Sequence, residues 1–452
     1  MVALPRAGYT QTTYIILRTL KIKFENTLAF AKKLDNSDPL RSYRSHFFIP
    51  KGNKKTLIYF SGHSLGLQPK SVADFINAEL KDWAEHGVDG HEHARRPWLY
   101  YHKFSKKTLA GIVGAKSSEV VAMNQLTVNL HLLMVSFYKP TRERFKIMME
   151  AGAFSSDQYA VESQLRFHGL DPNNALIEIK PREGEHTLRT EDIEKKIEEN
   201  ASSLALILFG GVQYYTGQFF DIEKITAAGH DVGAIVGFDL AHAVGNVDLH
   251  LHKHKVDFAG WCSYKYLNSG PGGLAGIFIH EKHFSQNHSR FAGWWGHQEG
   301  ERFKMKGGFL PMHGADGWQV SNVPIFQAAA HLASLEIFGK IGMKALRQKS
   351  IKLTGYLEFL LKELEHNDQL FNVITPTPIE QRGCQLSLLI KSNGKKIFNF
   401  LTRHGVIADW REPNVIRIAP VPLYNSFEDV FRFSKIFESA LSGDGQRKQV
   451  TK

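Results

Sequence analysis

An acidic side chain and an amine follow two short apolar segments of the chain. Asp239 ends the segment 234–239, and Lys265 comes directly after the segment 258–263. If these segments are neighbouring strands of one sheet, the carboxylate and the amine can face each other across a planar cofactor. The lysine would hold an aldehyde as a Schiff base, and the aspartate would keep a pyridine nitrogen protonated so that the ring accepts electrons. Pyridoxal phosphate requires such a pair.

Each member of this pair also has an ordinary structural explanation. A lysine after a strand is usually a solvated charge, and an aspartate after an apolar segment usually closes a turn or caps a helix. Ser263 and Tyr264 lie beside the amine, and the flexible segment Gly-Pro-Gly-Gly at 270–273 follows it. These neighbours favour the catalytic interpretation, but spacing alone leaves both open.

Apolar segments alternate with amphipathic ones over most of the chain. Strands are expected at 57–60, 119–123, 145–149, 204–209, 234–239, 258–263 and 274–279. Helices are expected at about 70–85, 105–114, 128–137, 156–169, 190–200 and 221–230. This alternation predicts a mostly parallel sheet whose ligands lie beyond the carboxyl ends of the strands, where Asp239, Lys265, Thr127 and Phe154 fall.

The last quarter of the chain has a different pattern. A long amphipathic stretch at 324–364 is interrupted by glycines, and strands at 385–390 and 415–419 precede a helix at 427–441. This pattern predicts a smaller α+β domain. We expect an N-terminal extension and arm contributing to the small domain (1–65), a large domain that binds pyridoxal phosphate (66–335) and the small C-terminal domain (336–452).

Composition narrows the function classes. The chain has 452 residues, 43% hydrophobic and 22% charged, and a net charge of +11. No apolar segment reaches the roughly 18 residues of a membrane span. Cys262 and Cys384 cannot make a disulfide framework, so we expect a cytoplasmic protein. The positive charge is dispersed, which favours an enzyme with an anionic substrate or cofactor over a nucleic-acid-binding protein.

The first 23 residues are basic and contain no acid. Their basic residues are Arg6, Arg18, Lys21 and Lys23. This composition is typical of an organelle transit peptide and also of a poorly ordered extension. Because periodicity through 14–17 is weak, the extension is the favoured interpretation.

Four further residues could bind a ligand. Thr127, at a predicted helix N-terminus, could bind phosphate or be an ordinary cap. Phe154 could stack on a flat ring or pack in the core. Tyr215 could bind phosphate or move a proton, or be a packed aromatic. Arg417, a charge inside an apolar strand, could bind a carboxylate or face water at a sheet edge.

A histidine-rich loop is the remaining candidate. His91 and His93 are followed by Arg95 and Arg96, which suits an acidic substrate. The loop has no helical His-x-x-x-His spacing and no nearby cysteine, so a metal site is disfavoured.

Six segments together resemble the kynureninase family. They are 60–69, 126–131, 180–185, 237–246, 261–268 and 419–425, within a likeness that runs from about 40 to 441. The resemblance implies an α/β fold, fold type I of the pyridoxal-phosphate-dependent transferases, with a mostly parallel seven-stranded sheet in the large domain. It implies hydrolytic cleavage of kynurenine or 3-hydroxykynurenine to alanine and an anthranilate, in tryptophan degradation and NAD biosynthesis.

The resemblance also implies residue roles. Those implied to be catalytic are Lys265, Asp239 and Tyr215. Those implied to bind the cofactor are Leu126, Thr127, Phe154, Ser155, Ser156, Asp157, Gly210, Asp239, His242, Tyr264, Lys265, Trp294 and Asn322. Those implied to bind substrate are Ser64, His91, Trp295, Asn322 and Arg417. No metal, nucleic acid or membrane is implied. Trp294 and Asn322 would come from the second subunit of a homodimer with shared active sites.

Two positions depart from the family pattern. The family often has asparagine where this chain has His63, and serine where it has Gly210. His63 adjoins the substrate-contacting Ser64, so it could alter substrate preference. The pair His91 and Asn322 resembles the type that prefers 3-hydroxykynurenine.

Two other functions remain open at this point. A cysteine desulfurase shares the fold, but it needs a thiolate on a mobile loop, and Cys384 lies at the start of a predicted strand. A non-enzymatic binding protein could use the basic surface, and steep salt dependence would reveal it.

Overall fold

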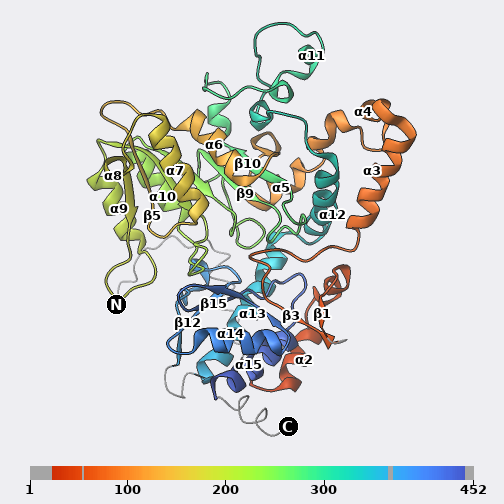
Figure 1. Cartoon of the computed structure of the whole chain (residues 1–452), viewed down its shortest axis with the longest axis vertical. Helices are drawn as coiled ribbons and strands as arrows, with labels where there is room; N and C mark the ends of the chain where they lie inside the picture. The colour runs from red at the N-terminus through yellow and green to blue at the C-terminus, as the bar shows by residue number, and fades with distance from the viewer. Residues whose placement is uncertain (1–22, 53–54, 365–369, 443–452) are drawn as a thin grey trace, which may run out of the picture.

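Two sheets organise the chain (Figure 1). The structure is a computed structural model that describes residues 23–52, 55–364 and 370–442. The predicted N-terminal extension lies outside these residues, except for its last part. No helix in the described ranges is long and apolar enough to cross a membrane.

The larger sheet has seven strands in the order β4-β10-β9-β8-β7-β5-β6. Their bounds are β4 (Val120–Ala122), β5 (Lys146–Glu150), β6 (Leu176–Ile179), β7 (Leu204–Gly210), β8 (Ile235–Asp239), β9 (Phe258–Cys262) and β10 (Ala275–Ile279). Strands β5 to β9 pair in parallel, whereas β10 is antiparallel to both of its neighbours. The predicted mostly parallel seven-stranded sheet is therefore confirmed, although the pattern did not reveal β6.

Helices cover both faces of this sheet. They are α5 (Lys106–Val113), α6 (Leu126–Phe137), α7 (Ser155–Phe167), α8 (Pro172–Ala175), α9 (Thr190–Glu199), α10 (Ile222–Asp231) and α12 (Ile325–Ile341), and α3 (Val72–His86) packs against α12. In the central strand β7, Leu206 and Leu208 belong to the same core as α6 and α7, while Ile207 and Phe209 belong to the core of α9 and α10. This two-sided burial explains why the strand is apolar throughout.

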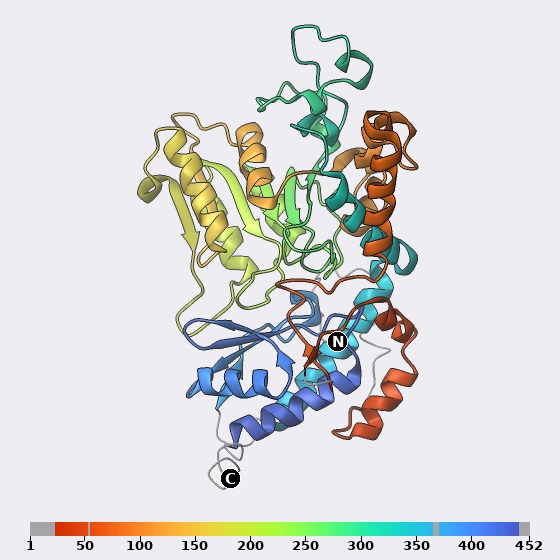
Figure 2. The ribbon, with the colours of Figure 1, turned by 45° about the vertical axis from the view of Figure 1, so that its right-hand side comes forward.

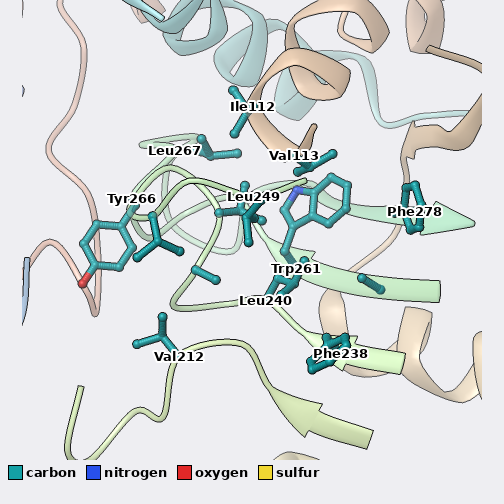
Figure 3. Close-up of a cluster of buried hydrophobic side chains, with 14 of the residues drawn as sticks. Ile112, Val113, Val212, Phe238, Leu240, Leu249, Trp261, Tyr266, Leu267 and Phe278 are labelled. Atoms are coloured by element: carbon teal, nitrogen blue, oxygen red, sulfur yellow. The ribbon is translucent and has the colours of Figure 1, made fainter. Parts of the chain in front are cut away.

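The core also fixes the segment around Lys265. Figure 3 shows Trp261 of β9 reaching toward Val113 of α5, with Phe278 of β10 on the same side. Tyr266 and Leu267, the two residues that follow Lys265, are buried in this cluster. The lysine is thus held between a strand and a buried turn.

The smaller sheet is antiparallel throughout, in the order β11-β12-β15-β14. Its strands are β11 (Phe371–Val373), β12 (Leu386–Ile390), β14 (Asp409–Arg411) and β15 (Val415–Ile418). It is accompanied by α13 (Met343–Leu364), α14 (Gly394–Arg403) and α15 (Phe427–Leu441). Gly342, with a φ of 76°, ends α12, so the predicted interruption is confirmed there, whereas the helix runs through Gly339.

The N-terminal residues pack against this small sheet and its helices (Figure 2). Helix α2 (Leu28–Asn36) lies against α15, and Asp35 accepts hydrogen bonds from the first two backbone N–H groups of that helix, at 2.8 and 2.9 Å. Strand β3 (Ile58–Tyr59) pairs in parallel with β13 (Val406–Ile407). The proposed domain boundaries stay predictions, and the one after residue 335 falls within α12.

Candidate active site

Lys265 and Asp239 lie at the same edge of the large sheet. Asp239 is the last residue of β8 and pairs in register with Gly260 of β9, five residues before Lys265. The Lys265 amine is buried, 3.1 Å from Nε2 of His242 and 5.7 Å from the centre of the Phe154 ring. Burial and the Lys265 charge hold the pKa of His242 well below its usual value, so the imidazole is neutral.

Two buried aspartates lie near this amine, and a third buried acid, Glu150, lies near Asp239. The side chains of Asp157 and Asp239 share a hydrogen bond, and burial raises the pKa of both. Glu150, at the end of β5, accepts the backbone N–H of Gly210 at 3.1 and 3.2 Å, and burial raises its pKa to about 7. Burial thus disfavours the ionised form of both aspartates near Lys265, and a further positive charge, such as a protonated pyridine nitrogen, would stabilise it.

An exposed aromatic ring lies beside the amine. Phe154 precedes α7, and its side chain is 40% exposed, so the alternative that it packs in the core is wrong. Its ring meets that of Tyr214 edge to face, with centroids 5.3 Å apart. The exposed ring is available for a flat ligand.

Two helix N-termini are directed to the carboxyl edge of the same sheet. Leu126 and Thr127 begin α6, and Ser155 and Ser156 begin α7. Neither helix has a side-chain cap, which leaves its first N–H groups available to an anion. Burial raises the pKa of Tyr215 and of Tyr264, so both phenols stay protonated hydrogen-bond donors. This donor set fits a phosphate group.

Arg417 is buried in β15 and faces the large sheet's loops. Its side chain is 1% exposed, so the alternative of a water-facing edge charge is wrong. One terminal nitrogen pairs with the carboxylate of Asp409, and the other donates to the backbone oxygen of Tyr214 at 2.6 Å. His63 is fully buried, with Nε2 3.5 Å from the same carboxylate. Besides burial, the charges of Lys265 and Arg417 both lower the pKa of His242, so this guanidinium lies close to the lysine site.

The small sheet holds three successive carbonyls of the large domain. Gln385 donates to the oxygen of Tyr214 at 2.9 Å, and Ser387 donates to that of Tyr215 at 2.6 Å. Thr375 donates to the oxygen of Thr216. Tyr215 is thus positioned by hydrogen bonds from the other domain.

Four predicted residues lie elsewhere within this chain. His91 is in α4 (Gly90–His93), where its ring packs against Trp98. Trp294 and Trp295 precede α11 (Glu299–Arg302), whose segment projects from the molecule in Figures 1 and 2, and Asn322 lies shortly before α12. Among the described residues, none of their hydrogen bonds, ion pairs or ring contacts reaches Lys265. Ser64 is exposed and follows His63.

Two site residues were not predicted from the sequence. Glu150 ends a buried strand, as Asp239 does, and that shared pattern could have revealed it. Asp409 gave no signal, because it is one of several charges in 409–412. The position of Glu150 also explains Gly210. A Cβ at residue 210 would lie 2.9 Å from Glu150 Oε1, so a serine there would be in steric conflict with this acid.

A cluster of Glu119, His252 and His280 has ligand atoms within 4.8 Å of one another. Its atoms already have partners, because Glu119 accepts from the N–H groups of Lys116 and Glu281 and from His252, each at 2.8 or 2.9 Å. These bonds are typical of a structural network.

Both cysteines are buried, at Cys262 and Cys384. Burial raises the pKa of Cys384 to about 12, and its N–H donates to Asn246 at 2.9 Å. Neither thiol has the exposure or low pKa of a reactive nucleophile.

Comparison with known proteins gives a consistent result. The chain is 54% identical over 420 residues to the kynureninase of Flavobacterium psychrophilum, covering 92% of this chain and 99% of that protein. It is 50% identical over 429 residues to the kynureninase of Rattus norvegicus, covering 91% and 92%. The family model described as the kynureninase C-terminal domain matches residues 346–437.

Solved structures share the fold at low identity. The cysteine desulfurase of Thermococcus onnurineus NA1 has a TM-score of 0.70 and 21% identity, covering 86% of this chain and 95% of that one. A C-DES variant with glycine covalently linked to its pyridoxal phosphate has a TM-score of 0.71 and 15% identity, covering 84% and 96%. The fold is that of the fold type I enzymes, and the chain belongs to the kynureninase family.

Proposed function

We propose that the site around Lys265 hydrolyses the Cβ–Cγ bond of kynurenine and 3-hydroxykynurenine, releasing alanine and the corresponding anthranilate. As a kynureninase family member, the chain is a hydrolase that acts on carbon–carbon bonds and uses pyridoxal phosphate. The observation that carries the proposal is one buried amine set against a buried, hydrogen-bonded pair of aspartates at neighbouring strand ends.

The cofactor, when bound, supplies an electron sink for the bonds that break at the substrate. Lys265 would attach to its aldehyde and, once released, take and return the proton at the substrate's α-carbon. His242, neutral and 3.1 Å away, accepts a hydrogen bond from this amine and orients it. Asp239 would hold the proton at the ring nitrogen, with Asp157 as its hydrogen-bonded neighbour.

The remaining residues would bind and orient. The N-termini at Thr127 and Ser155, with Tyr215 and Tyr264, would hold the phosphate. Phe154 would cover one face of the ring. Arg417 would bind the α-carboxylate, because its buried guanidinium acts on His242 together with Lys265 and its Nε has no hydrogen-bond partner in the described part of the chain.

A homodimer would complete the site. The projecting segment exposes large apolar side chains, namely Phe291, Trp294, Phe303, Met305 and Leu310. Leu80 and Trp83, on the predicted apolar face of α3, are also exposed. Such surfaces are typical of subunit interfaces, and a second copy is the occupant that would bring Trp294 and Asn322 to the cofactor and His91 to the substrate. We place this dimer in the cytoplasm, with 3-hydroxykynurenine as its preferred substrate.

Product formation tests the activity. Purified protein with added pyridoxal phosphate should release fluorescent 3-hydroxyanthranilate from 3-hydroxykynurenine faster than anthranilate from kynurenine. Borohydride reduction followed by peptide mapping should place the cofactor on Lys265. Absence of both products from fully loaded protein would refute the substrate assignment, and a reduced adduct elsewhere would refute the site.

Subunit complementation tests the shared site. Lys265→Ala and Trp294→Ala are each expected to be nearly inactive, while a mixed dimer contains one site that carries neither change. Activity should therefore return after the two variants are mixed and re-equilibrated. No recovery in mixtures that form mixed dimers would place Trp294 in the same subunit's site.

A further inference from the structure

Three adjacent strands of the small sheet place polar side chains in one row. Ser387 of β12 and Asp409 of β14 are both register partners of Arg417 in β15. The register positions one residue along, Leu388 and Trp410 opposite Ile416, are apolar. The row of Ser387, Arg417 and Asp409 is therefore polar next to an apolar row, and it lies on the side that holds the Tyr214 and Tyr215 carbonyls.

The carboxylate of Asp409 collects several positive or donor groups. Arg417 pairs with Oδ2, Arg411 donates to the same oxygen at 3.2 Å, and His63 Nε2 lies 3.5 Å from it. Burial opposes its charge, but His63 and the two arginines hold the pKa of Asp409 well below its usual value. The aspartate is thus ionised wherever the enzyme works.

Arg417 is anchored at two of its three nitrogens. Asp409 binds one terminal nitrogen and the Tyr214 oxygen accepts from the other. Nε has no hydrogen-bond partner in the described part of the chain, although it is buried. With both terminal nitrogens bound, the guanidinium still offers its Nε edge to a planar carboxylate. Because the guanidinium is already oriented before the ligand arrives, binding costs less conformational entropy.

Charge in this part of the site also favours a further anion. Arg417 and Arg411 share the carboxylate of Asp409, while burial lowers the pKa of His63 to about 4 and leaves it neutral. One aspartate therefore orients Arg417 without cancelling the positive potential.

We propose that Asp409 is a positioning residue for substrate recognition, acting through Arg417 to align its fork with the substrate's α-carboxylate. This inference rests on the proposed function of Arg417. Asp409 itself does not touch the reacting atoms. Its removal should therefore weaken binding of ligands that carry the carboxylate and spare those that lack it.

The test compares Asp409→Asn with Arg411→Gln, which removes the second and more exposed arginine bound to the same carboxylate oxygen. In Asp409→Asn holoenzyme, KM for kynurenine should rise about 10- to 100-fold, with kcat within about threefold of the wild type. Inhibition by kynuramine, which lacks the α-carboxylate, should be unchanged. Arg411→Gln should alter KM less than about threefold.

Thermal melting curves of the variants show which of them are folded, and a second variant, Asp409→Glu, tests the same position more conservatively. Asp409→Glu keeps the charge but shifts it by one methylene, so its KM should lie between those of the wild type and Asp409→Asn. An unchanged or lower KM in folded Asp409→Asn, or equal losses for kynurenine and kynuramine, would overturn the inference.

Arg417→Met tests the role of Arg417 separately from that of Asp409. If it leaves the KM for kynurenine unchanged, the proposed function of Arg417 fails. If it raises KM while Asp409→Asn does not, only the role of Asp409 fails.

Discussion

Two buried aspartates at opposite ends of the same sheet have very different surroundings. Asp257, just before β9, accepts hydrogen bonds from His230 at 2.9 Å, His283 at 2.8 Å and the backbone N–H of Val236 at 2.7 Å, and Lys282 is 2.6 Å away. Burial opposes its charge, but these partners hold its pKa well below the usual value. Hydrogen bonds and an ion pair within the protein therefore compensate the buried charge of Asp257.

Asp239, at the carboxyl edge, is in the reverse situation. Its nearest charged neighbours are two more acids, Asp157 and Glu150, and one amine, Lys265. Burial raises its pKa despite the amine. The charge of the structural Asp257 is thus compensated by protein groups, whereas that of Asp239 is left for a ligand to compensate.

Lys265→Ala removes the cation from the functional end and should have the largest effect. We expect kcat to fall at least about 10³-fold, because the covalent attachment and the proton transfer are both lost. Release of 3-hydroxyanthranilate measures the rate, and borohydride should no longer fix the cofactor. Residual activity above a few per cent would break the assignment.

Asp239→Asn should separate function from stability. Activity should fall about 10²- to 10³-fold, because the amide cannot hold a proton at the ring nitrogen. The cofactor-free protein should be no less stable than the wild type, since a raised carboxyl pKa means that ionisation costs stability as pH rises. Thermal melting at pH 8 checks this, and a large loss there would show that Asp239 is structural.

Asp257→Asn should give the opposite result. Removing one partner from a buried charge network costs about 3 to 5 kcal/mol, so melting should shift down strongly at pH 7. Because the pKa of Asp257 is depressed, its contribution exists above the ordinary pKa and fades on acidification, so the difference should shrink toward pH 3. The kcat of the folded fraction should be unchanged.

Glu150→Gln should change how the stability of the cofactor-free protein depends on pH. The pKa of Glu150 is raised from 4.5 to about 7, so its contribution is complete below pH 4.5 and is lost as pH rises through 7. The cofactor-free wild type should lose about 2 to 3 kcal/mol between pH 5 and pH 8 at this group, and the variant should not. Parallel melting curves for both proteins over that range would contradict the buried acid's role.

His63→Asn should have the smallest effect. It installs the residue that the family often carries, and the ratio of kcat/KM for the two kynurenines should change about three- to tenfold. Because His63 is neutral above its pKa of about 4, the pH profile from 6 to 9 should keep its shape. A new inflection in that range would show that His63 titrates during turnover.

The sequence predicted the parts of the fold that periodicity encodes. The strand around 204–209 is apolar because both of its faces are covered, and its neighbours were recognised for the same reason. Strand β6 was missed because Leu176–Ile179 is short and only its last residue is buried. The antiparallel direction of β10 could not be predicted either, because it depends on how the chain connects β9 to β10 and not on the residues of the strand.

The sequence predicted the site best where a strand end carries the chemistry. Lys265 and Asp239 follow apolar segments, so their shared edge could be inferred from the chain. Asp409 pairs with Arg417 across the hairpin of β14 and β15, and the sequence did not predict a strand at 409–411. The resemblance to the kynureninase family implied a role for Arg417 without naming the residue that holds it.

The three carbonyls at Tyr214, Tyr215 and Thr216 have a consequence for engineering. Each is held by a side chain from the C-terminal part, and Phe219 donates its N–H to the oxygen of Gln381 at 2.8 Å. A chimaera that takes its C-terminal half from a relative therefore has to import the loop 212–219 as well. Grafted without that loop, the new half would dock on a foreign partner and leave Tyr215 misaligned.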